Sequence, residues 1–212
     1  MDLDTAISEC PLIAVLRGIT PAECEAVGNA LLESGFRIIE VPLNSPQPLE
    51  SIRLLAELFG ENSLIGAGTV LSPTAVDDVA GAGGRLIVMP HSDPAVITAA
   101  KGRNLACLPG VATPTEAFAA LAAGADALKL FPAEAIPPNA VKALRAVLPV
   151  DTRLLPVGGI GAHNMAAYLE TGAAGFGIGS TLYKPGKTAE DVRREASALV
   201  EAYLSATRTT AL

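Results

Sequence analysis

One short pattern recurs along most of this sequence and limits what the chain can fold into. Each copy begins with a run of apolar, often β-branched residues, continues through a polar residue and a proline, and leads into a segment rich in alanine and leucine. The clearest copies begin with residues 12–21, 38–46, 64–73, 86–94 and 105–114. Because the apolar runs do not alternate with polar residues, each is predicted to be a strand buried on both faces of a parallel sheet.

The polar residue before each proline predicts where the following helix begins. Side-chain oxygens that can cap a helix N-terminus occur once in each copy, on Thr20, Ser45, Ser72, Asp93 and Thr113. The proline that follows has a suitable φ and lacks the N–H that the first helical turn leaves unpaired. In the second copy a further proline, Pro48, allows the helix to begin there instead. Left-handed glycines are predicted to end helices at Gly35, Gly60 and Gly124.

Three further units with weaker punctuation occupy residues 125–148, 153–172 and 174–204. Eight strand–helix units predict an α/β fold in the form of a closed (β/α)8 barrel, a TIM barrel, with a short helix before the first strand. An open doubly wound sheet is the alternative, and it fits less well because no G-x-G-x-x-G motif follows the first strand. No linker or change of composition divides the chain, so residues 1–212 are expected to form one domain.

Composition and charge exclude several classes of protein. Half of the residues are hydrophobic and 17% are charged, which suits a large buried core. The net charge of −7 argues against binding to nucleic acid or to an anionic membrane. Three scattered cysteines and two histidines predict neither a disulfide framework nor a metal site. No apolar run has the length of a membrane span, and the first ten residues do not resemble a signal peptide, so we expect a cytoplasmic protein.

Three charged residues stand in or directly after predicted buried strands, namely Arg17, Glu40 and Lys129. A charge at such a position is unfavourable unless it is paired or neutralised, and active sites of barrels lie at the carboxyl ends of the strands. Desolvation of Lys129 would lower its pKa and yield the neutral amine that a Schiff-base enzyme requires. The alternative is a structural lysine–glutamate pair without chemistry.

Glu40 and Arg17 each have two interpretations. In a pocket of low dielectric constant the pKa of Glu40 would rise, so that its carboxyl group could transfer protons. Alternatively, Glu40 is only an ion-pair partner of Arg17 or Lys129. The guanidinium of Arg17 suits a carboxylate or a phosphate, but it could equally be a surface charge in a loop.

Glycine clusters end the last two predicted strands, at residues 157–160 and 175–180. Barrels often bind phosphate there through backbone N–H groups, although tight turns also require glycine. Two such clusters on consecutive strands favour a phosphate site. Residues 66–69 (GAGT) leave space beside a ligand and offer the hydroxyl of Thr69. His91 is expected to make a structural or polar contact, and His163 to begin a helix.

Taken together, these segments resemble the class I 2-keto-3-deoxy-6-phospho-sugar-acid aldolases. The resemblance is carried, between about residues 11 and 182, by EVPLNSP, GAGTVL, the Met89-Pro90 pair, PGVATPTEAF, ALKLFPA, KAL and PVGGI. It implies that Lys129 is the Schiff-base lysine and Glu40 the general acid and base. It also implies a cytosolic homotrimer that needs no metal and has no cofactor besides the covalent lysine imine.

The resemblance further implies two groups of substrate-binding residues. Contacts to the keto-acid end would come from Arg17, Thr69 and the backbone near Pro90. The phosphate would lie at Gly158, Gly159, Gly179 and Ser180. The implied substrates and products are a phosphorylated keto acid, pyruvate and glyceraldehyde 3-phosphate.

Two departures separate this chain from the gluconate-type members of the family. Those members usually carry Thr-Gly-Gly where this chain has Val157-Gly158-Gly159, and an arginine where it has Asn44. Both departures resemble the galactonate-type enzymes, and Val157 would then act in the choice between C4 epimers. His91 stands where asparagine is expected. The implied reaction is the reversible retro-aldol cleavage of 2-dehydro-3-deoxy-6-phospho-D-galactonate.

Three other functions stay open at this point. The first is cleavage of the gluconate epimer, as in the Entner-Doudoroff route. The second is a phosphosugar isomerase or epimerase on the same barrel, in which Glu40 would be a base and Lys129 would act only through its charge. The third is a barrel that binds a sugar phosphate without turnover, although such a protein needs no buried nucleophile.

Overall fold

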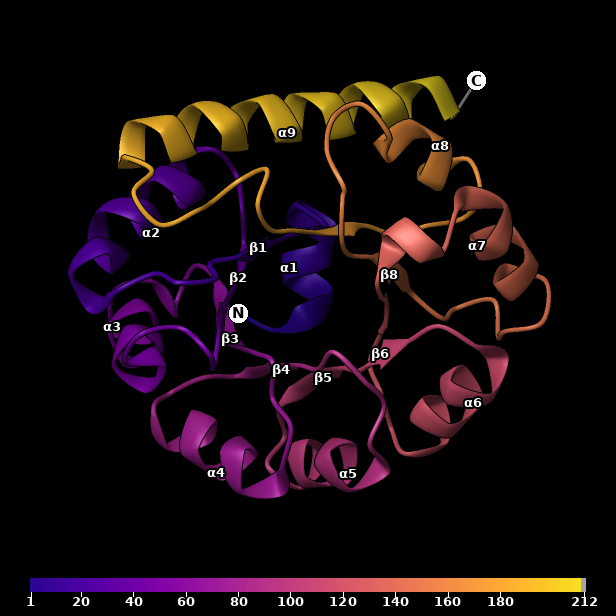
Figure 1. The fold of residues 1–212 in the computed structure, drawn as a ribbon, viewed down its shortest axis with the longest axis horizontal. Coiled ribbons are helices and arrows are strands. Elements are labelled where there is room, and N and C mark those ends of the chain that lie inside the picture. Colours follow the sequence, from indigo (N-terminus) through magenta and orange to yellow (C-terminus); the bar gives the residue numbers. More distant parts are fainter. Residues whose placement is uncertain (211–212) are drawn as a thin grey trace.

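Parallel strands and helices alternate along the chain in the computed structural model, which describes residues 1–210 (Figure 1). The strands within this range are β1 (Leu12–Val15), β2 (Ile38–Pro42), β3 (Leu64–Gly68), β4 (Leu86–Val88), β5 (Ala106–Leu108), β6 (Gly110–Val111), β7 (Leu128–Leu130), β8 (Leu154–Pro156) and β9 (Phe176–Ile178). Almost every residue of these strands is buried, as expected for strands that are covered on both faces.

The strands form two sheets in the described part of the chain. Six strands pair in the order β5-β4-β3-β2-β1-β9, three pair in the order β6-β7-β8, and all pairs are parallel. Only Pro109 separates β5 from β6, and a parallel bridge joins Val157 to Gly177. The predicted parallel α/β architecture is therefore confirmed, whereas the eight expected strands are divided into two curved sheets.

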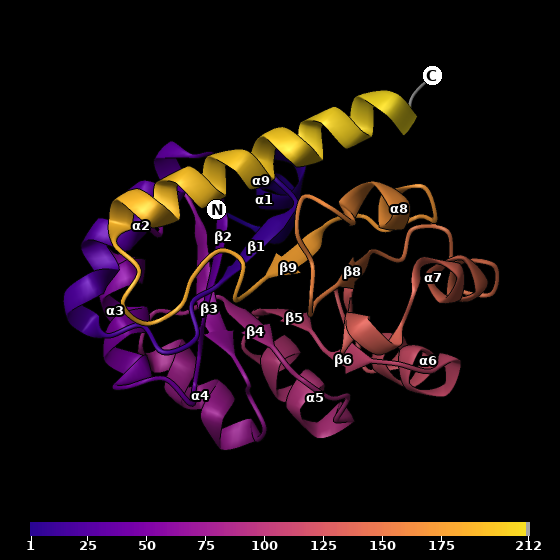
Figure 2. The ribbon, with the colours of Figure 1, turned by 45° about the horizontal axis from the view of Figure 1, so that its top comes forward.

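All helices except α1 (Leu3–Glu9) surround the strands on the outside (Figures 1 and 2). The outer helices are α2 (Cys24–Glu33), α3 (Pro48–Phe59), α4 (Pro73–Gly81), α5 (Pro94–Gly102), α6 (Pro114–Ala122), α7 (Pro138–Arg145), α8 (Met165–Leu169) and α9 (Ala189–Thr210). Short 3-10 helices at Pro21–Glu23 and Ala133–Ala135 precede α2 and α7. The long helix α9 packs on α2 and α8, and so joins the first and last parts of the chain.

Most helices begin where the polar residue and the proline predict. Ser72, Asp93 and Thr113 accept hydrogen bonds from the first turns of α4, α5 and α6. Helix α3 begins at Pro48, so the hydroxyl of Ser45 is free to accept from the N–H of Gly18, at 2.9 Å.

Helices end near all three predicted glycines. Gly35 and Gly124 both have a φ of 100°, the left-handed conformation that ends a helix. Helix α3 ends at Phe59 with Gly60 as its C-cap, so the predicted end is confirmed there too. The left-handed conformation expected of Gly60 is wrong, because its φ is −61° and its N–H donates to the carbonyl of Ala56.

Helix α1 closes one end of the strands. Its residues Leu3 and Ala6 pack against apolar side chains inside the ring, including Ile13, Ile38 and Leu64. In Figure 1 this helix lies in the middle of the ring. The predicted short N-terminal helix is thus confirmed, and it covers the end at which the strands begin.

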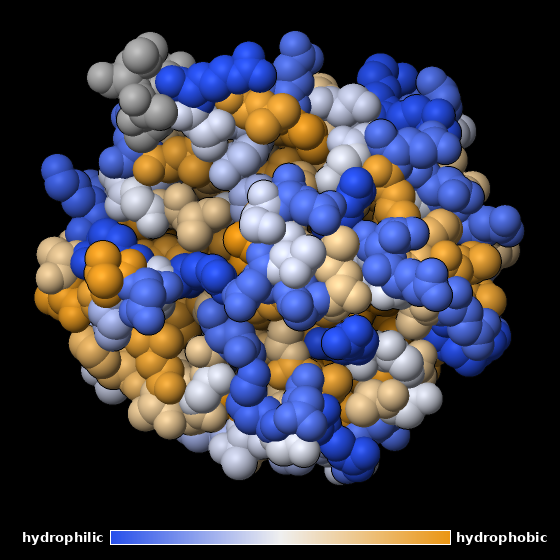
Figure 3. Space-filling model, turned by 180° about the vertical axis from the view of Figure 1, so that it is seen from behind, coloured by the Kyte–Doolittle hydropathy of each residue, from blue (hydrophilic) through white to orange (hydrophobic). Residues whose placement is uncertain are grey.

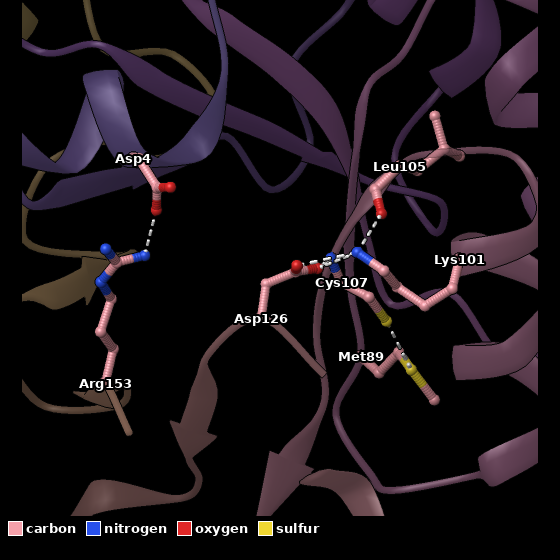
Figure 4. Close-up of polar contacts among 7 residues, drawn as sticks. All are labelled: Asp4, Met89, Lys101, Leu105, Cys107, Asp126 and Arg153. Atoms are coloured by element: carbon pink, nitrogen blue, oxygen red, sulfur yellow. Dashed lines mark hydrogen bonds and ion pairs between the residues drawn. The ribbon is translucent and has the colours of Figure 1, made fainter. Parts of the chain in front are cut away.

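A cavity at the same end of the strands is lined by charged side chains that form ion pairs (Figure 4). Arg153 forms an ion pair of 2.6 Å with Asp4 of α1, and Lys101 forms one of 2.6 Å with Asp126. Asp126 also accepts from the backbone N–H of Cys107 at 2.8 Å. The cavity has a volume of about 390 Å³. Because these charges already have partners, we interpret this end as structural.

The outer surface is mixed in character. Figure 3 shows hydrophilic side chains spread over the rear face, with hydrophobic areas between them. Among the described residues, large exposed apolar side chains occur on several different elements, at Leu49, Leu58, Leu71, Phe118, Val147, Val150 and Leu204. Isolated residues of this kind are common on protein surfaces. Within residues 1–210, none of the helices combines the length and the apolar character needed to cross a membrane.

Candidate active site

A cavity of about 440 Å³ lies at the end of the strands opposite α1. Its walls come from the loops that follow β1, β7, β8 and β9, which all leave the sheets on this side. Seven of the predicted site residues line it: Arg17, Lys129, Val157, Gly158, Gly159, Gly179 and Ser180. The structure therefore brings together the predicted lysine, arginine and glycine clusters, which are far apart in the sequence.

Lys129 is the middle residue of β7 and is only 7% exposed. Its backbone N–H donates to the carbonyl of Pro109 at 2.9 Å, which fixes the strand beneath the side chain. Burial lowers the pKa of the Lys129 amine, the carboxylate of Glu40 opposes this effect, and the positive charge of Arg17 adds to it. The Nζ atom lies 4.6 Å from the ring centroid of Phe131, a contact that favours the ammonium form. The burial favours a neutral, nucleophilic amine.

Glu40 is the third residue of β2 and is 2% exposed. Burial raises the pKa of its carboxyl group to about 7, although the positive charges of Lys129 and Arg17 lower it. Its Oε2 atom is buried and has no hydrogen-bond partner in the described structure. A carboxyl group with a pKa near neutrality can both donate and accept a proton, which general acid–base catalysis requires.

Gly68 provides the space for this carboxyl group. An ideal Cβ atom at residue 68 would lie 1.9 Å from Glu40 Oε2 and 2.4 Å from Cδ. The GAGT segment was predicted to leave space beside a ligand, but at Gly68 the space is filled by a side chain of the protein itself.

Arg17 follows β1 and is exposed at the mouth of the cavity. Its Nη1 atom donates to Oδ1 of Asn44 at 2.8 Å, and Asn44 follows β2. One residue further along each loop, the N–H of Gly18 donates to the hydroxyl of Ser45. Two hydrogen bonds therefore connect these loops, and Asn44, one of the departures from the gluconate type, holds the guanidinium.

The two glycine clusters both form turns at the cavity, and the first has a backbone conformation that favours glycine. Gly158 and Gly159 have φ values of 113° and 62°, both in the left-handed region. At Gly179 a turn begins, because its carbonyl accepts from the N–H groups of Leu182 and Tyr183. The first N–H groups of such a turn have no acceptor within it, which suits an anion.

Three predicted residues do not line the cavity. Glu40 is not among the lining residues, but it is close enough for its charge to act on Lys129 and Arg17. Thr69 is half-buried with a φ of 57°, and Pro90 is half-buried after β4. Both follow strands on the same side as the cavity, but neither belongs to its walls.

His91 is exposed, and His163 lies in the turn before α8 rather than in the helix.

Sequence analysis missed several residues of the cavity wall. The aromatic and charged ones are Phe131, Glu134, Tyr183 and Lys184. Lys184 follows the last glycine cluster closely, so a basic residue next to an expected phosphate site could have been noticed. Glu134 packs on the diglycine turn, since a Cβ at Gly158 would lie 2.3 Å from its Oε2 atom. No sequence signal indicated this contact.

The described residues contain no group of three or more His, Cys, Asp or Glu side chains that could hold a metal ion. The chemistry available in the cavity is that of a buried amine, a buried carboxyl group and a set of turns rich in N–H groups. An amine of this kind can attack a carbonyl carbon to form a Schiff base.

Fold and cavity define a parallel α/β protein whose buried lysine suits Schiff-base chemistry. A family model, "KDPG and KHG aldolase", matches residues 3–197, and the chain belongs to this aldolase family. The family resemblance noted in the sequence is thereby confirmed.

Two curated relatives are similar over almost the whole chain. A Rhizobium meliloti protein named "Probable 2-dehydro-3-deoxy-6-phosphogalactonate aldolase" is 51% identical over 195 residues, which are 92% of this chain and 92% of that protein. The Escherichia coli protein "2-dehydro-3-deoxy-6-phosphogalactonate aldolase" is 48% identical over 199 residues, which are 94% of this chain and 97% of the relative.

Solved structures show the same fold. One described as "Native KDPGal structure" has a TM-score of 0.93 and 48% identity, and the match covers 94% of this chain and 97% of that one. The KDPG aldolase from Legionella pneumophila, "with pyruvate captured at low pH as a covalent carbinolamine intermediate", has a TM-score of 0.81 and 28% identity, with coverage of 97% and 98%.

Proposed function

We propose that this chain catalyses the reversible cleavage of 2-dehydro-3-deoxy-6-phosphogalactonate to pyruvate and D-glyceraldehyde 3-phosphate. The reaction proceeds through a Schiff base on Lys129, with Glu40 as general acid and base and without a metal ion. One observation carries the proposal: a buried amine on β7 and a buried carboxyl group on β2 belong to different sheets, yet they lie close enough for each charge to act on the pKa of the other group. Family membership supports the reaction type.

The substrate lies across the cavity with its two anionic ends held apart. Arg17, held by Asn44, binds the keto-acid end, and this end extends from the cavity toward Thr69 and the backbone at Pro90, which follow β3 and β4 on the same side. The phosphate lies on the turns formed by Gly158, Gly159, Gly179 and Ser180, with Lys184 nearby. Binding at both ends positions the bond that is cleaved, and this binding energy contributes to catalysis rather than only to affinity.

The first half of the reaction forms the imine. The neutral Lys129 amine attacks the C2 ketone, and transfer of a proton from nitrogen to oxygen gives the carbinolamine. Protonated Glu40 donates its proton to the departing hydroxyl group, which leaves as water, and the nitrogen lone pair forms the C=N bond. The protonated imine is the electron sink for the next step. The related Legionella structure, with its covalent carbinolamine, supports this step.

The second half cleaves the C3–C4 bond. The Glu40 carboxylate takes the proton of the C4 hydroxyl, the C4–O electrons form the aldehyde, and the electrons of the C3–C4 bond move into the iminium. Glyceraldehyde 3-phosphate leaves, and an enamine of pyruvate remains on Lys129. Glu40 then returns the proton to C3. Addition of water to the imine, with Glu40 taking a proton, restores the starting state and releases pyruvate.

Selection of the galactonate epimer is supported by two observations. Val157 lines the cavity and carries methyl groups where gluconate-type members usually have a threonine hydroxyl. The relatives with 51% and 48% identity carry the galactonate name, whereas the Legionella protein with a gluconate name is 28% identical. The alternative substrate is the gluconate epimer.

The chain is further proposed to be a single domain over residues 1–212 whose two sheets together form one closed (β/α)8 barrel. Three contacts support closure: the single residue Pro109 between β5 and β6, the hydrogen bond from Asp126 N–H to the Cys107 carbonyl, and the bridge from Val157 to Gly177.

A cytoplasmic homotrimer follows from the family resemblance, and light scattering would detect a mass three times that of the 21.5 kDa chain.

Parallel assays of the two C4-epimeric substrates test the reaction, with pyruvate production as the readout. We expect cleavage of both, with higher kcat/KM for the galactonate epimer. Borohydride added with pyruvate should leave a reduced adduct on Lys129, and the Lys129→Ala variant should give none. Turnover of a phosphosugar without an adduct would instead support an isomerase or epimerase, and ligand-dependent thermal stabilisation without turnover would support a binding protein.

A further inference from the structure

We propose that Gly68 is a positioning residue for this reaction, because the absence of a side chain at residue 68 allows the Glu40 carboxyl group to occupy its place inside the ring. This inference rests on the role of Glu40 given above. It assigns a function to one glycine of the GAGT segment. This glycine would act by positioning a side chain of the neighbouring strand β2 and not by contacting the substrate.

The first argument is the position of the carboxyl atoms. An ideal Cβ at residue 68 would lie 1.9 Å from Oε2, 2.4 Å from Cδ and 2.5 Å from Oε1 of Glu40. All three distances are far below the contact distance of two non-bonded atoms. The carboxyl group of Glu40 thus fills the volume that the first carbon of any side chain at residue 68 would need.

The second argument is that the backbone itself does not require glycine here. Gly68 is the last residue of β3, it is paired with Pro42 of β2, and its carbonyl accepts from the N–H of Leu43 at 2.8 Å. Its φ is not among the left-handed values of the chain. An alanine could therefore adopt the backbone conformation of residue 68, but only if the carboxyl group of Glu40 moved away.

The third argument concerns what else holds the carboxyl group. Oε2 of Glu40 is buried without a hydrogen-bond partner in the described structure, so no donor fixes this atom. Because no hydrogen bond holds Oε2, the packing of the surrounding atoms determines where the carboxyl group lies. A methyl group at residue 68 would push it out of this position, and a displacement of about 1 Å at a reacting group can lower a rate about 100-fold.

The test compares Gly68→Ala with Gly81→Ala, since nothing lies within 4 Å of a Cβ at Gly81. We expect Gly68→Ala to lower kcat roughly 10- to 100-fold with a smaller change of KM, and to shift the pH dependence of kcat. Gly81→Ala should change neither. Borohydride trapping with pyruvate should still label Lys129 in Gly68→Ala. A wild-type kcat and pH profile in Gly68→Ala would overturn the proposal.

A shorter acid distinguishes positioning from a general structural effect. In a Glu40→Asp background the carboxyl group is withdrawn by one methylene, so Gly68→Ala should lower kcat less than it does in the wild type. A loss of the same factor in both backgrounds would contradict the proposal.

A stability measurement covers the case in which Gly68→Ala alone does not fold. In a Glu40→Ala background there is no carboxyl group to displace, so adding Gly68→Ala should leave the melting temperature unchanged. A large drop there would contradict the inference. Failure of the wild type to form a Lys129 adduct would instead refute the proposed function and leave this stability comparison valid.

Discussion

Replacement of Glu40 by glutamine should stabilise the protein above neutral pH while it lowers activity. The pKa of Glu40 is raised to about 7 by burial, against an ordinary value of 4.5 for an unfolded chain. Between these two values the folded state binds a proton that the unfolded state has lost, so stability falls as pH rises. At 1.36 kcal/mol per pH unit, the ionisation of Glu40 costs about 3 kcal/mol once the pH is above 7.

Glutamine resembles the protonated acid in size and cannot ionise, so Glu40→Gln avoids this cost. We expect the variant and the wild type to have similar unfolding free energies at pH 5, and the variant to be more stable by up to about 3 kcal/mol at pH 8. Lys129 is coupled to Glu40, and loss of the negative charge would reduce this gain, since the carboxylate favours the ammonium form.

The measurement is urea unfolding at pH 5, 6, 7 and 8, at one protein concentration. Glu61→Gln, at an exposed position, is the matched control and should show no pH-dependent gain. Activity of Glu40→Gln should fall at least 100-fold, as expected for loss of a general acid and base. A stability difference that does not grow between pH 5 and pH 8 would refute the assignment of a buried, ionising carboxyl group.

Four further predictions concern the cavity. Asn44→Ala should raise KM for the keto-acid substrate about 3- to 10-fold in steady-state assays, because Arg17 loses a partner, while Asn62→Ala should not. Val157→Thr should lower the galactonate-to-gluconate ratio of kcat/KM about 10-fold; an unchanged ratio places selectivity elsewhere. Glu134→Gln should lower KM for glyceraldehyde 3-phosphate in the synthetic direction about fivefold by removing a repelling charge, but not KM for glyceraldehyde. Incubation with EDTA should leave kcat unchanged, and inactivation would indicate a metal-dependent reaction.

The sequence predicted structure well where a single residue type restricts the backbone conformation or requires a special environment. The prolines at 73, 94 and 114 mark helix starts because proline suits the first turn and few other places in a helix. Lys129 and Glu40 could be selected because each is a charge in an otherwise apolar run, and such a charge requires a special environment. These inferences need no knowledge of what lies across the ring.

Contacts between loops could not be predicted from the sequence. The hydrogen bond from Arg17 to Asn44 joins residues 27 positions apart, and nothing in either segment specifies the direction of the two side chains. The packing of Glu134 on the diglycine turn has the same character. The conformation predicted for Gly60 was wrong for a different reason: glycine permits the left-handed conformation without requiring it, and the C-cap of α3 has a right-handed φ.

Strand division also depends on tertiary context. Residues 105–114 contain one apolar run in the sequence, but the structure divides it into β5 and β6 at Pro109. Before this residue the chain pairs with β4, and after it with β7. Proline has no N–H to donate, so it interrupts the ladder at the position where the partner changes.

The position of α1 has a consequence for the side from which the cavity is reached. Because Leu3 and Ala6 of α1 pack inside the ring at the end where the strands begin, the cavity lies at the opposite end. In the proposed reaction the pyruvate fragment stays bonded to Lys129, whereas the aldehyde fragment is released unbound. We therefore expect glyceraldehyde 3-phosphate to leave before pyruvate, past the loops that follow β1, β7, β8 and β9. In the synthetic direction, pyruvate must form its enamine before the aldehyde can react.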